Sequence, residues 1–255
     1  MIRKVYFIMH SCFVVEMDDR YLLFDYFDKN KNKDLQDFDG VLPEFSPEKK
    51  LYVFSSHGHR DHWDISCLKW ADERENIQYI LSKHIRLGAN YLARNGIKSD
   101  IKKSIKFVTA NEKYTVDDME IETLRSTDEG VAYIVTVGEQ CIYHAGDLNW
   151  WAQTEKGELY CETIGSAYKR ALRPLKDRRV DVAFVVMDGN LPKNTYYYGM
   201  DYFLTNVNAD MVFPMHMWGK FDLINAYKKR PEIEGRLLDK VVDIECENMI
   251  FEIEA

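Results

Sequence analysis

A cluster of potential metal ligands follows one apolar run of the chain: three histidines and one aspartate within six residues, at His57, His59, Asp61 and His62. The preceding run Leu51–Phe54 predicts a buried strand, and Gly58 is expected to bend the chain where that strand ends. The two alternating histidines can then converge on one point, while the adjacent aspartate and histidine can face a second. Imidazole and carboxylate are the ligands of zinc and similar ions, whose catalytic sites keep a position open for water. A solvated polar loop explains the cluster poorly, because the chain has only 7 histidines in 255 residues.

Two further potential ligands stand at the ends of predicted strands. Asp147 follows Cys141–Tyr143 after a small-residue turn containing Gly146, and a carboxylate in such a turn can bridge two cations. His216 comes just after the apolar run Met211–Phe213. Taken alone, the aspartate fits a helix cap and the histidine fits a structural role. The cluster at 57–62 needs ligands from elsewhere in the chain, however, and this requirement favours metal binding at both positions.

The elements that must position these residues are mostly short strands. Apolar or alternating runs predict about a dozen of them: besides Leu51–Phe54, they are Val5–Ile8, Cys12–Val15, Tyr21–Phe24, Gln78–Leu81, Ile105–Val108, Met119–Leu124, Val131–Val137, Cys141–Tyr143, Val180–Val186, Met211–Phe213, Val241–Ile244 and Ile250–Ile253. Asp18–Arg20 reads as a hairpin turn. His10 and Ser11 lie in the first turn and Asp25 ends the third strand, so these three could cluster at one sheet edge.

Helical patterns lie between the strands in both halves of the chain. We expect helices at Ile65–Asn76 and Ile85–Asn95, the second ended by Gly96, and Ala152–Arg173 is helix-compatible. The polar stretch Asp28–Pro47 lacks periodicity and reads as an exposed loop that could border a site. No linker or repeat divides the chain. The pattern therefore fits one layered α/β domain over residues 1–255, with two sheets packed on each other and helices outside.

Composition narrows the class of protein. Lysine and arginine total 34 against 42 acidic residues, a net charge of −8, which disfavours a general nucleic-acid or anionic-membrane binder. The five cysteines are scattered without a Cys-x-x-Cys pair, as in reduced cytosolic proteins. We see no signal peptide at the N-terminus and no apolar run near the ~20 residues that span a bilayer. A cytoplasmic protein is expected, and the sequence leaves its oligomeric state open, a homo-oligomer included.

The order of these motifs resembles the metallo-β-lactamase superfamily: His-x-His-x-Asp-His after a strand, a later Gly-Asp after a strand, and a later His after another. Met9–Phe13 and Leu22–Asp25 make the chain most similar to the metal-dependent hydrolase branch that includes ascorbate-phosphate-lactonase-like proteins. The resemblance spans most of the chain. It implies a four-layer αββα sandwich with two divalent metal ions, typically zinc, in a groove at one edge of the two sheets.

The resemblance also implies ligand roles for individual residues. His57 and His59 match ligands of the first metal, Asp147 matches the bridging carboxylate, and the second metal takes Asp61, His62 and His216. The family usually places a third histidine for the first metal between the motif and the Gly-Asp aspartate, but Leu124–Val131 contains none. Asp128 is the nearest substitute, with Glu129 second, because carboxylate oxygen also coordinates zinc, iron or manganese. The alternative is a weakened first site and a protein that works with one metal.

Other residues near these motifs have several interpretations. His10 could contact substrate, donate to a ligand or make a structural hydrogen bond; His144 is expected to be structural, and His84 to lie on the surface. Aromatic residues close to the proposed ligands could wall a substrate pocket or could simply fill the core: they are Trp150, Trp151, Tyr198 and Trp218. Asp188 ends the strand at 180–186 and could edge the groove.

These residues favour a hydrolase that uses a metal-activated water on a small-molecule ester, lactone or phosphodiester. Asp61 is the candidate catalytic residue, since it could orient the nucleophile and move a proton to the leaving group. No Gly-x-Ser-x-Gly elbow or phosphate-binding glycine loop is present. The alternatives are a non-catalytic metal-binding or ligand-sensing protein of the same fold, a di-iron oxidoreductase, and a nuclease, which the negative charge disfavours.

Overall fold

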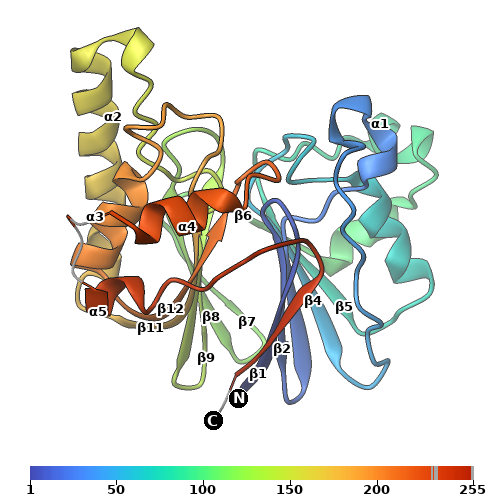
Figure 1. The fold of residues 1–255 in the computed structure, drawn as a ribbon. Coiled ribbons are helices and arrows are strands. Elements are labelled where there is room, and N and C mark those ends of the chain that lie inside the picture. Colours follow the sequence, from blue (N-terminus) through green and yellow to red (C-terminus); the bar gives the residue numbers. More distant parts are fainter. Residues whose placement is uncertain (231, 233–234, 254–255) are drawn as a thin grey trace. The chain divides into compact units, whose positions relative to one another are not determined.

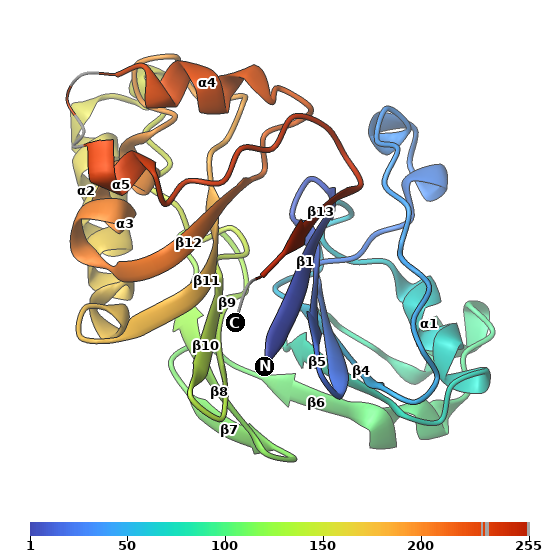
Figure 2. The same cartoon turned by 60° about the horizontal axis from the view of Figure 1, so that its bottom comes forward.

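The computed structural model describes residues 1–230, 232 and 235–253. The chain forms two compact units, a first unit of Met1–Thr109 with Glu247–Ala255 and a second unit of Ala110–Cys246. Each unit is built on one sheet, with helices beside it (Figures 1 and 2). The five cysteines are free thiols, as expected. No helix in the described part of the chain has the length and apolar character to cross a bilayer.

The sheet of the first unit has seven strands in the order β13-β1-β2-β3-β4-β5-β6. The strands are β1 (Ile2–Met9), β2 (Cys12–Met17), β3 (Arg20–Phe24), β4 (Lys50–Ser55), β5 (Ile77–Ser82), β6 (Ile105–Val108) and β13 (Met249–Glu252). β1, β2 and β3 form an antiparallel meander, and β3 through β6 are parallel. The carboxyl ends of β1, β3 and β4 therefore share one edge, which brings the turns after all three strands together.

The helical segments of the first unit are shorter than predicted. The segment expected at Ile65–Asn76 is a 3-10 helix over Ile65–Asp72, and the one expected at Ile85–Asn95 is α1 (Ala89–Arg94). The chain turns at Lys83 and His84 directly after β5, where the N–H of Ile85 donates to the carbonyl of Ser82 at 2.9 Å, and α1 begins only at Ala89. Three shorter 3-10 helices complete the unit, at Lys29–Lys31, Lys33–Leu35 and Ser99–Ser104.

The sheet of the second unit has six strands in the order β12-β11-β10-β9-β8-β7. The strands are β7 (Lys113–Val116), β8 (Met119–Arg125), β9 (Val131–Val137), β10 (Gln140–His144), β11 (Arg179–Val186) and β12 (Asn208–Met215). β10, β11 and β12 are parallel. β9 is antiparallel to β10 and β8 is antiparallel to β9, so β8 runs in the same direction as β10. The carboxyl ends of β8, β10, β11 and β12 consequently lie along one edge. Strand β7 was not predicted.

Helices α2 (Glu158–Ala171) and α3 (Tyr198–Asn206) lie on one side of the β11–β12 end of this sheet (Figure 2). α4 (Asp222–Lys228) and α5 (Gly235–Leu238) follow β12, with 3-10 helices at Thr154–Lys156 and Arg173–Leu175. Among these only the segment containing α2 was predicted.

Two strand predictions in the second unit need correction. The expected strand Val241–Ile244 is a single bridge from Val241 to Val212. Strand β12 does not end before Pro214 but continues to Met215. A proline is tolerated there because β12 is the edge strand of its sheet, where a missing N–H breaks no ladder.

The core of the first unit includes a stacked aromatic pair on the neighbouring strands β3 and β4. The rings of Phe24 and Phe54 are 4.8 Å apart, and neither residue is exposed. We expect Phe54→Ala to lower the free energy of unfolding by about 3–5 kcal/mol, because it removes buried apolar surface and leaves a cavity. Urea denaturation monitored by circular dichroism measures the change.

Ile250→Ala is the matched control, since Ile250 on β13 is 56% exposed. It should change stability by about 0.5 kcal/mol or less. An equal loss in both variants would contradict the packing described for Phe54.

Candidate functional site

One carboxylate organises the sheet edge of the first unit. Asp25, directly after β3, accepts a hydrogen bond from Nδ1 of His62 at 2.8 Å. It also accepts the backbone N–H of Ser56 at 2.7 Å and the Ser56 hydroxyl at 2.6 Å. The same hydroxyl lies 2.9 Å from Nδ1 of His57. All four residues are buried, so one aspartate holds two motif histidines, one directly and one through a serine.

This network fixes which ring nitrogen carries the proton. The Asp25 carboxylate can only accept, so the Ser56 hydroxyl donates to it and offers a lone pair to His57. Nδ1 of His57 must then donate, and so must Nδ1 of His62. Both histidines are left with the lone pair on Nε2. Metal-binding histidines usually have this arrangement, with the other ring nitrogen donating to a carboxylate or a similar partner.

The Nε2 atoms lie among the other candidate ligands of this unit. Oδ2 of Asp61 is 3.7 Å from Nε2 of His62 and 3.3 Å from Nε2 of His10. Nε2 of His57 is 3.0 Å from Nδ1 of His59. His10, Ser11 and Asp25 were expected at one sheet edge, and His10 and Asp25 are indeed there, each in contact with a motif residue. His10 lies beside Asp61, a position that sequence reasoning had left open.

The loop Asp28–Pro47 borders this edge, as expected. The ring of His10 packs 5.3 Å from Phe38, and Lys31 forms an ion pair with Asp64 at 2.7 Å. Arg60, inside the motif, forms an ion pair with Asp34 at 2.8 Å. The loop is therefore tied to the ligand cluster by both an aromatic contact and opposite charges.

His84, expected on the surface, is partly exposed and also adjoins the motif. Its ring lies 5.8 Å from that of His59, and its Nδ1 accepts the backbone N–H of Gly58 at 3.0 Å. This histidine follows β5, whose carboxyl end adjoins that of β4, and the expected helix begins only at Ala89. Gly58 is not among the glycines with positive φ, so the bend does not depend on glycine's conformational freedom.

The second unit repeats the histidine–carboxylate arrangement at its own sheet edge. Nδ1 of His216, after β12, is 2.7 Å from Oδ2 of Asp188, after β11. Nε2 of His216 is 3.4 Å from Oδ1 of Asp147, after β10. Burial alone raises the pKa of Asp188, but the hydrogen bonds from His216, Asn190 and Trp218 outweigh it, so this pKa lies below its ordinary value. An ionised Asp188 holds the His216 proton on Nδ1.

Asp128 reaches the same edge from the end of β8. One carboxylate oxygen of Asp128 and one of Asp147 lie within 4.8 Å of each other. Glu129 is not in any group of candidate ligands found among the described residues. His144 plays the structural part expected of it, since its Nδ1 accepts the N–H of Gly146 in the turn before Asp147.

The aromatic residues expected near the ligands fall into two groups. The rings of Trp151 and Trp218 flank His216 at 5.7 and 5.5 Å, and the Trp218 indole donates to Asp188 at 3.2 Å. Trp150 and Tyr198 instead pack on each other, 5.2 Å apart, and line a surface pocket of about 310 Å³ with residues of α3.

Backbone strain is concentrated at these two edges. Seven non-glycine residues of the described chain have positive φ, and four of them are His10, Asp25, His216 and Trp218, with φ from 48° to 65°. Such conformations persist where the surrounding structure enforces them, and they cluster at functional sites.

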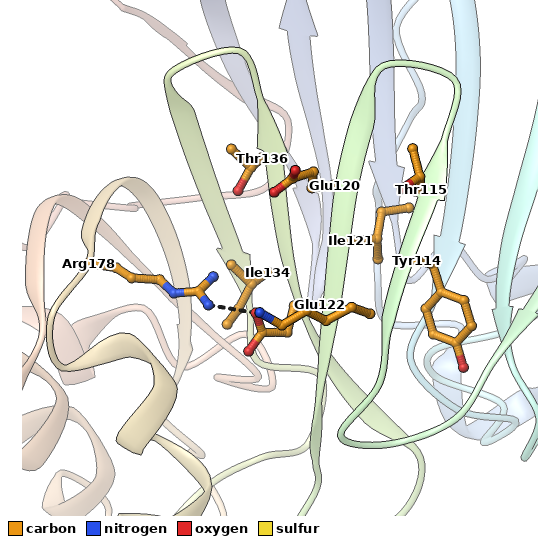
Figure 3. Close-up of a pocket in the computed structure, with 9 residues that line it drawn as sticks. Tyr114, Thr115, Glu120, Ile121, Glu122, Ile134, Thr136 and Arg178 are labelled. Atoms are coloured by element: carbon orange, nitrogen blue, oxygen red, sulfur yellow. Dashed lines mark hydrogen bonds and ion pairs between the residues drawn. The ribbon is translucent and has the colours of Figure 1, made fainter.

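A larger pocket, of about 400 Å³, lies on the face of β7, β8 and β9 (Figure 3). Its charged groups pair among themselves, since Glu122 contacts Arg178 at 2.6 Å and Lys113 at 3.3 Å. None of the proposed ligands lines it.

The residues present fit divalent metal ions. Imidazole nitrogen and carboxylate oxygen are the appropriate donors, and two of the histidines are oriented by buried carboxylates on their far side. Sequence reasoning placed Asp25 and Asp188 at the strand ends without this role, and it missed Ser56. The signal for the two aspartates was a lone carboxylate directly after a buried strand.

Residues 4–160 match the model of the β-lactamase superfamily domain. Because this match covers more than half of the chain, the protein belongs to that family of hydrolases. Its mixed α/β fold with two sheets and helices is the metallo-β-lactamase fold, as expected. None of the curated proteins matches the chain significantly.

Solved structures share this fold at low identity. Igni18, a metallo hydrolase from Ignicoccus hospitalis, is 18% identical with a TM-score of 0.57, and the match covers 100% of each chain. An isothiocyanate hydrolase from Delia radicum gut bacteria is 14% identical, with a TM-score of 0.51, over 98% of this chain and 100% of that one. CmlA, a diiron β-hydroxylase from Streptomyces venezuelae, is 14% identical, with a TM-score of 0.52, over 84% of this chain and 45% of that one.

The hydrogen-bond networks predict histidine tautomers in metal-free protein. His57, His62 and His216 should all carry the proton on Nδ1. In Asp25→Ala the ¹⁵N resonances of His57 and His62 should shift toward a tautomer mixture, because their acceptor network is lost. Long-range ¹H–¹⁵N spectra of the imidazoles measure this at a pH where the rings are neutral.

Asp188→Ala is the reciprocal control. It should alter the resonances of His216 and leave those of His57 and His62 unchanged. A wild-type protein with Nε2–H tautomers at His57 and His62 would contradict the role assigned to Asp25.

Proposed function

We propose that the protein is a metal-dependent hydrolase that uses a metal-activated water on a small-molecule ester, lactone or phosphodiester. The observation that carries this proposal is the arrangement of His62 and His216. In each, Nδ1 donates to a buried carboxylate while Nε2 lies 3.4–3.7 Å from a second carboxylate, Asp61 or Asp147. This is the arrangement of a metal ligand with its orienting partner.

The ligand sets of the two units are proposed to serve one two-metal centre, following the order of motifs in the family. His57, His59 and Asp128 would hold the first ion. Asp61, His62 and His216 would hold the second, and Asp147 would bridge the two. The proximity of Asp128 to Asp147 within the second unit supports Asp128, rather than Glu129, as the replacement for the family's third histidine.

Divalent ions in such a centre supply a water of lowered pKa and positive charge for a developing oxyanion. The residues of the chain supply the rest. Asp61, 15% exposed in its side chain, is proposed to orient the nucleophile and to move a proton to the leaving group. Trp151 and Trp218, beside His216, are proposed to exclude water and contact the apolar part of the substrate.

A small molecule is the proposed substrate. The net charge of −8 disfavours nucleic acid, and the motifs around His10 and Asp25 favour the lactonase-like branch of the family. Zinc is the proposed ion, with manganese or iron as alternatives.

A second candidate function is oxidation at a di-iron centre. The carboxylate at Asp128 favours it, since oxygen ligands suit iron better than an all-histidine site does. The structural similarity to part of CmlA, a diiron β-hydroxylase, supports this candidate. Absorbance of protein purified without oxygen distinguishes the two functions.

Asp128→Ala should lose about one metal ion per chain, because it removes one of the four proposed ligands of the first site and leaves two histidines and the shared Asp147. Plasma mass spectrometry of dialysed protein measures the loss. Glu129→Ala is the matched control and should keep the wild-type content. Unchanged metal content in Asp128→Ala would contradict the assignment.

Asp61→Asn should lower kcat/KM about 10²–10⁴-fold on any substrate found in a panel of esters, lactones and phosphodiesters. The amide retains the size of the side chain but cannot accept the proton. Asp34→Asn, on the bordering loop, should stay near the wild-type rate. If protein loaded with zinc, manganese or iron hydrolyses no member of the panel, the proposed hydrolase function fails.

A further inference from the structure

One hydroxyl joins the two loops that carry the candidate carboxylates of the second unit. Oγ1 of Thr127 donates to the backbone carbonyl of Asn149 at 2.6 Å. It also accepts the backbone N–H of the same residue at 3.0 Å. Thr127 precedes Asp128 and Asn149 follows Asp147 by two residues, so this pair of hydrogen bonds ties one loop to the other.

The neighbouring serine fixes the direction of the loop. Oγ of Ser126 accepts the backbone N–H of Asp128 at 3.1 Å, which closes a tight turn immediately after β8. Of two consecutive hydroxyl side chains, that of Ser126 therefore restrains the peptide group before Asp128, and that of Thr127 holds the backbone of Asn149. Asn149 is itself only 1% exposed, so the point of attachment is a fixed part of the unit.

The two loops joined in this way carry carboxylates that lie close together. One oxygen of Asp128 and one of Asp147 lie within 4.8 Å of each other. Two negative charges at that separation repel, and Asp128 is exposed and could turn toward solvent. The two hydrogen bonds from the Thr127 side chain to the backbone of Asn149 hold the two loops next to each other.

We infer that Thr127 is a positioning residue that preorganises Asp128 and Asp147 for a divalent cation. This inference rests on the proposed function, which makes the two aspartates metal ligands. Preorganisation raises affinity because the ligand side chains and their loops lose less conformational freedom when the ion binds. Groups that orient metal ligands typically change affinity 10–100-fold when removed.

The chain contains a close match for a control. Thr123, four residues earlier on β8, makes the same double contact with the backbone of Glu112. Its Oγ1 donates to the carbonyl and accepts the N–H, each at 3.2 Å. Thr123 anchors β8 to the loop before β7, and neither partner is a candidate ligand. Thr123→Val therefore removes an equivalent clamp without touching the Asp128 loop.

The test compares the zinc affinities of full-length Thr127→Val, Thr127→Ser and Thr123→Val, measured by competition with a chromophoric chelator. Thr127→Val should bind the weaker-held zinc ion about 10–100-fold less tightly, and Thr127→Ser should stay within about threefold of wild type. Thr123→Val should keep wild-type affinity. Thermal unfolding of the metal-free proteins reports how much stability each variant loses, and Thr127→Ala replaces Thr127→Val if the valine variant does not fold.

A double-variant cycle separates positioning from general damage. If Thr127 acts through Asp128, adding Thr127→Val to Asp128→Asn should cause no further loss of zinc affinity. An equal loss in both backgrounds overturns the inference, and so does an unchanged affinity in Thr127→Val. A wild-type protein that binds no zinc, manganese or iron overturns the proposed function and the inference together, whereas zinc binding that Thr127→Val leaves unchanged overturns the inference alone.

Discussion

The hydrogen bond from a histidine Nδ1 to a buried carboxylate is the interaction on which each candidate ligand set depends. Asp25 makes it with His62 and Asp188 makes it with His216. A neutral imidazole has one donor and one acceptor nitrogen, so the carboxylate decides which nitrogen can bind a metal. Without the hydrogen bond to the carboxylate, the same histidines at the same positions would be a mixture of tautomers. The strands matter because they deliver the carboxylate and the histidine from different parts of the chain to one sheet edge.

In both units, parallel pairing of strands brings the carboxylate and the histidine together. β3 pairs with β4, which places Asp25 beside Ser56, and β11 pairs with β12, which places Asp188 beside His216. The carboxyl ends of parallel strands open at the same edge, so polar residues just after them meet although they are about 30 positions apart. The buried strands behind them are apolar and close-packed, which holds the polar edge in place.

The sequence alone identifies the candidate ligands of the local motif, but it does not identify the contacts that depend on how the strands pair. His57, His59, Asp61 and His62 could be recognised because their spacing is local and follows an obvious strand. Asp25 could be placed at an edge, but its bond to His62 depends on the pairing of β3 with β4, which local patterns do not specify. The contacts of His84 with Gly58 and His59 were missed because they depend on the pairing of β4 with β5, which local patterns do not specify. The continuation of β12 through Pro214 depends on its being an edge strand, which only the sheet order reveals.

The left-handed backbone at His10, Asp25, His216 and Trp218 has a consequence for how this protein could change. A non-glycine residue in that region costs on the order of 1 kcal/mol, and glycine would relieve the cost while deleting the side chain. Selection for thermal stability would therefore favour glycine at positions where selection for chemistry retains histidine, aspartate and tryptophan. Under the proposed function, stability and activity place opposite demands on these four residues, and a stabilised variant of this chain would have to gain its stability elsewhere.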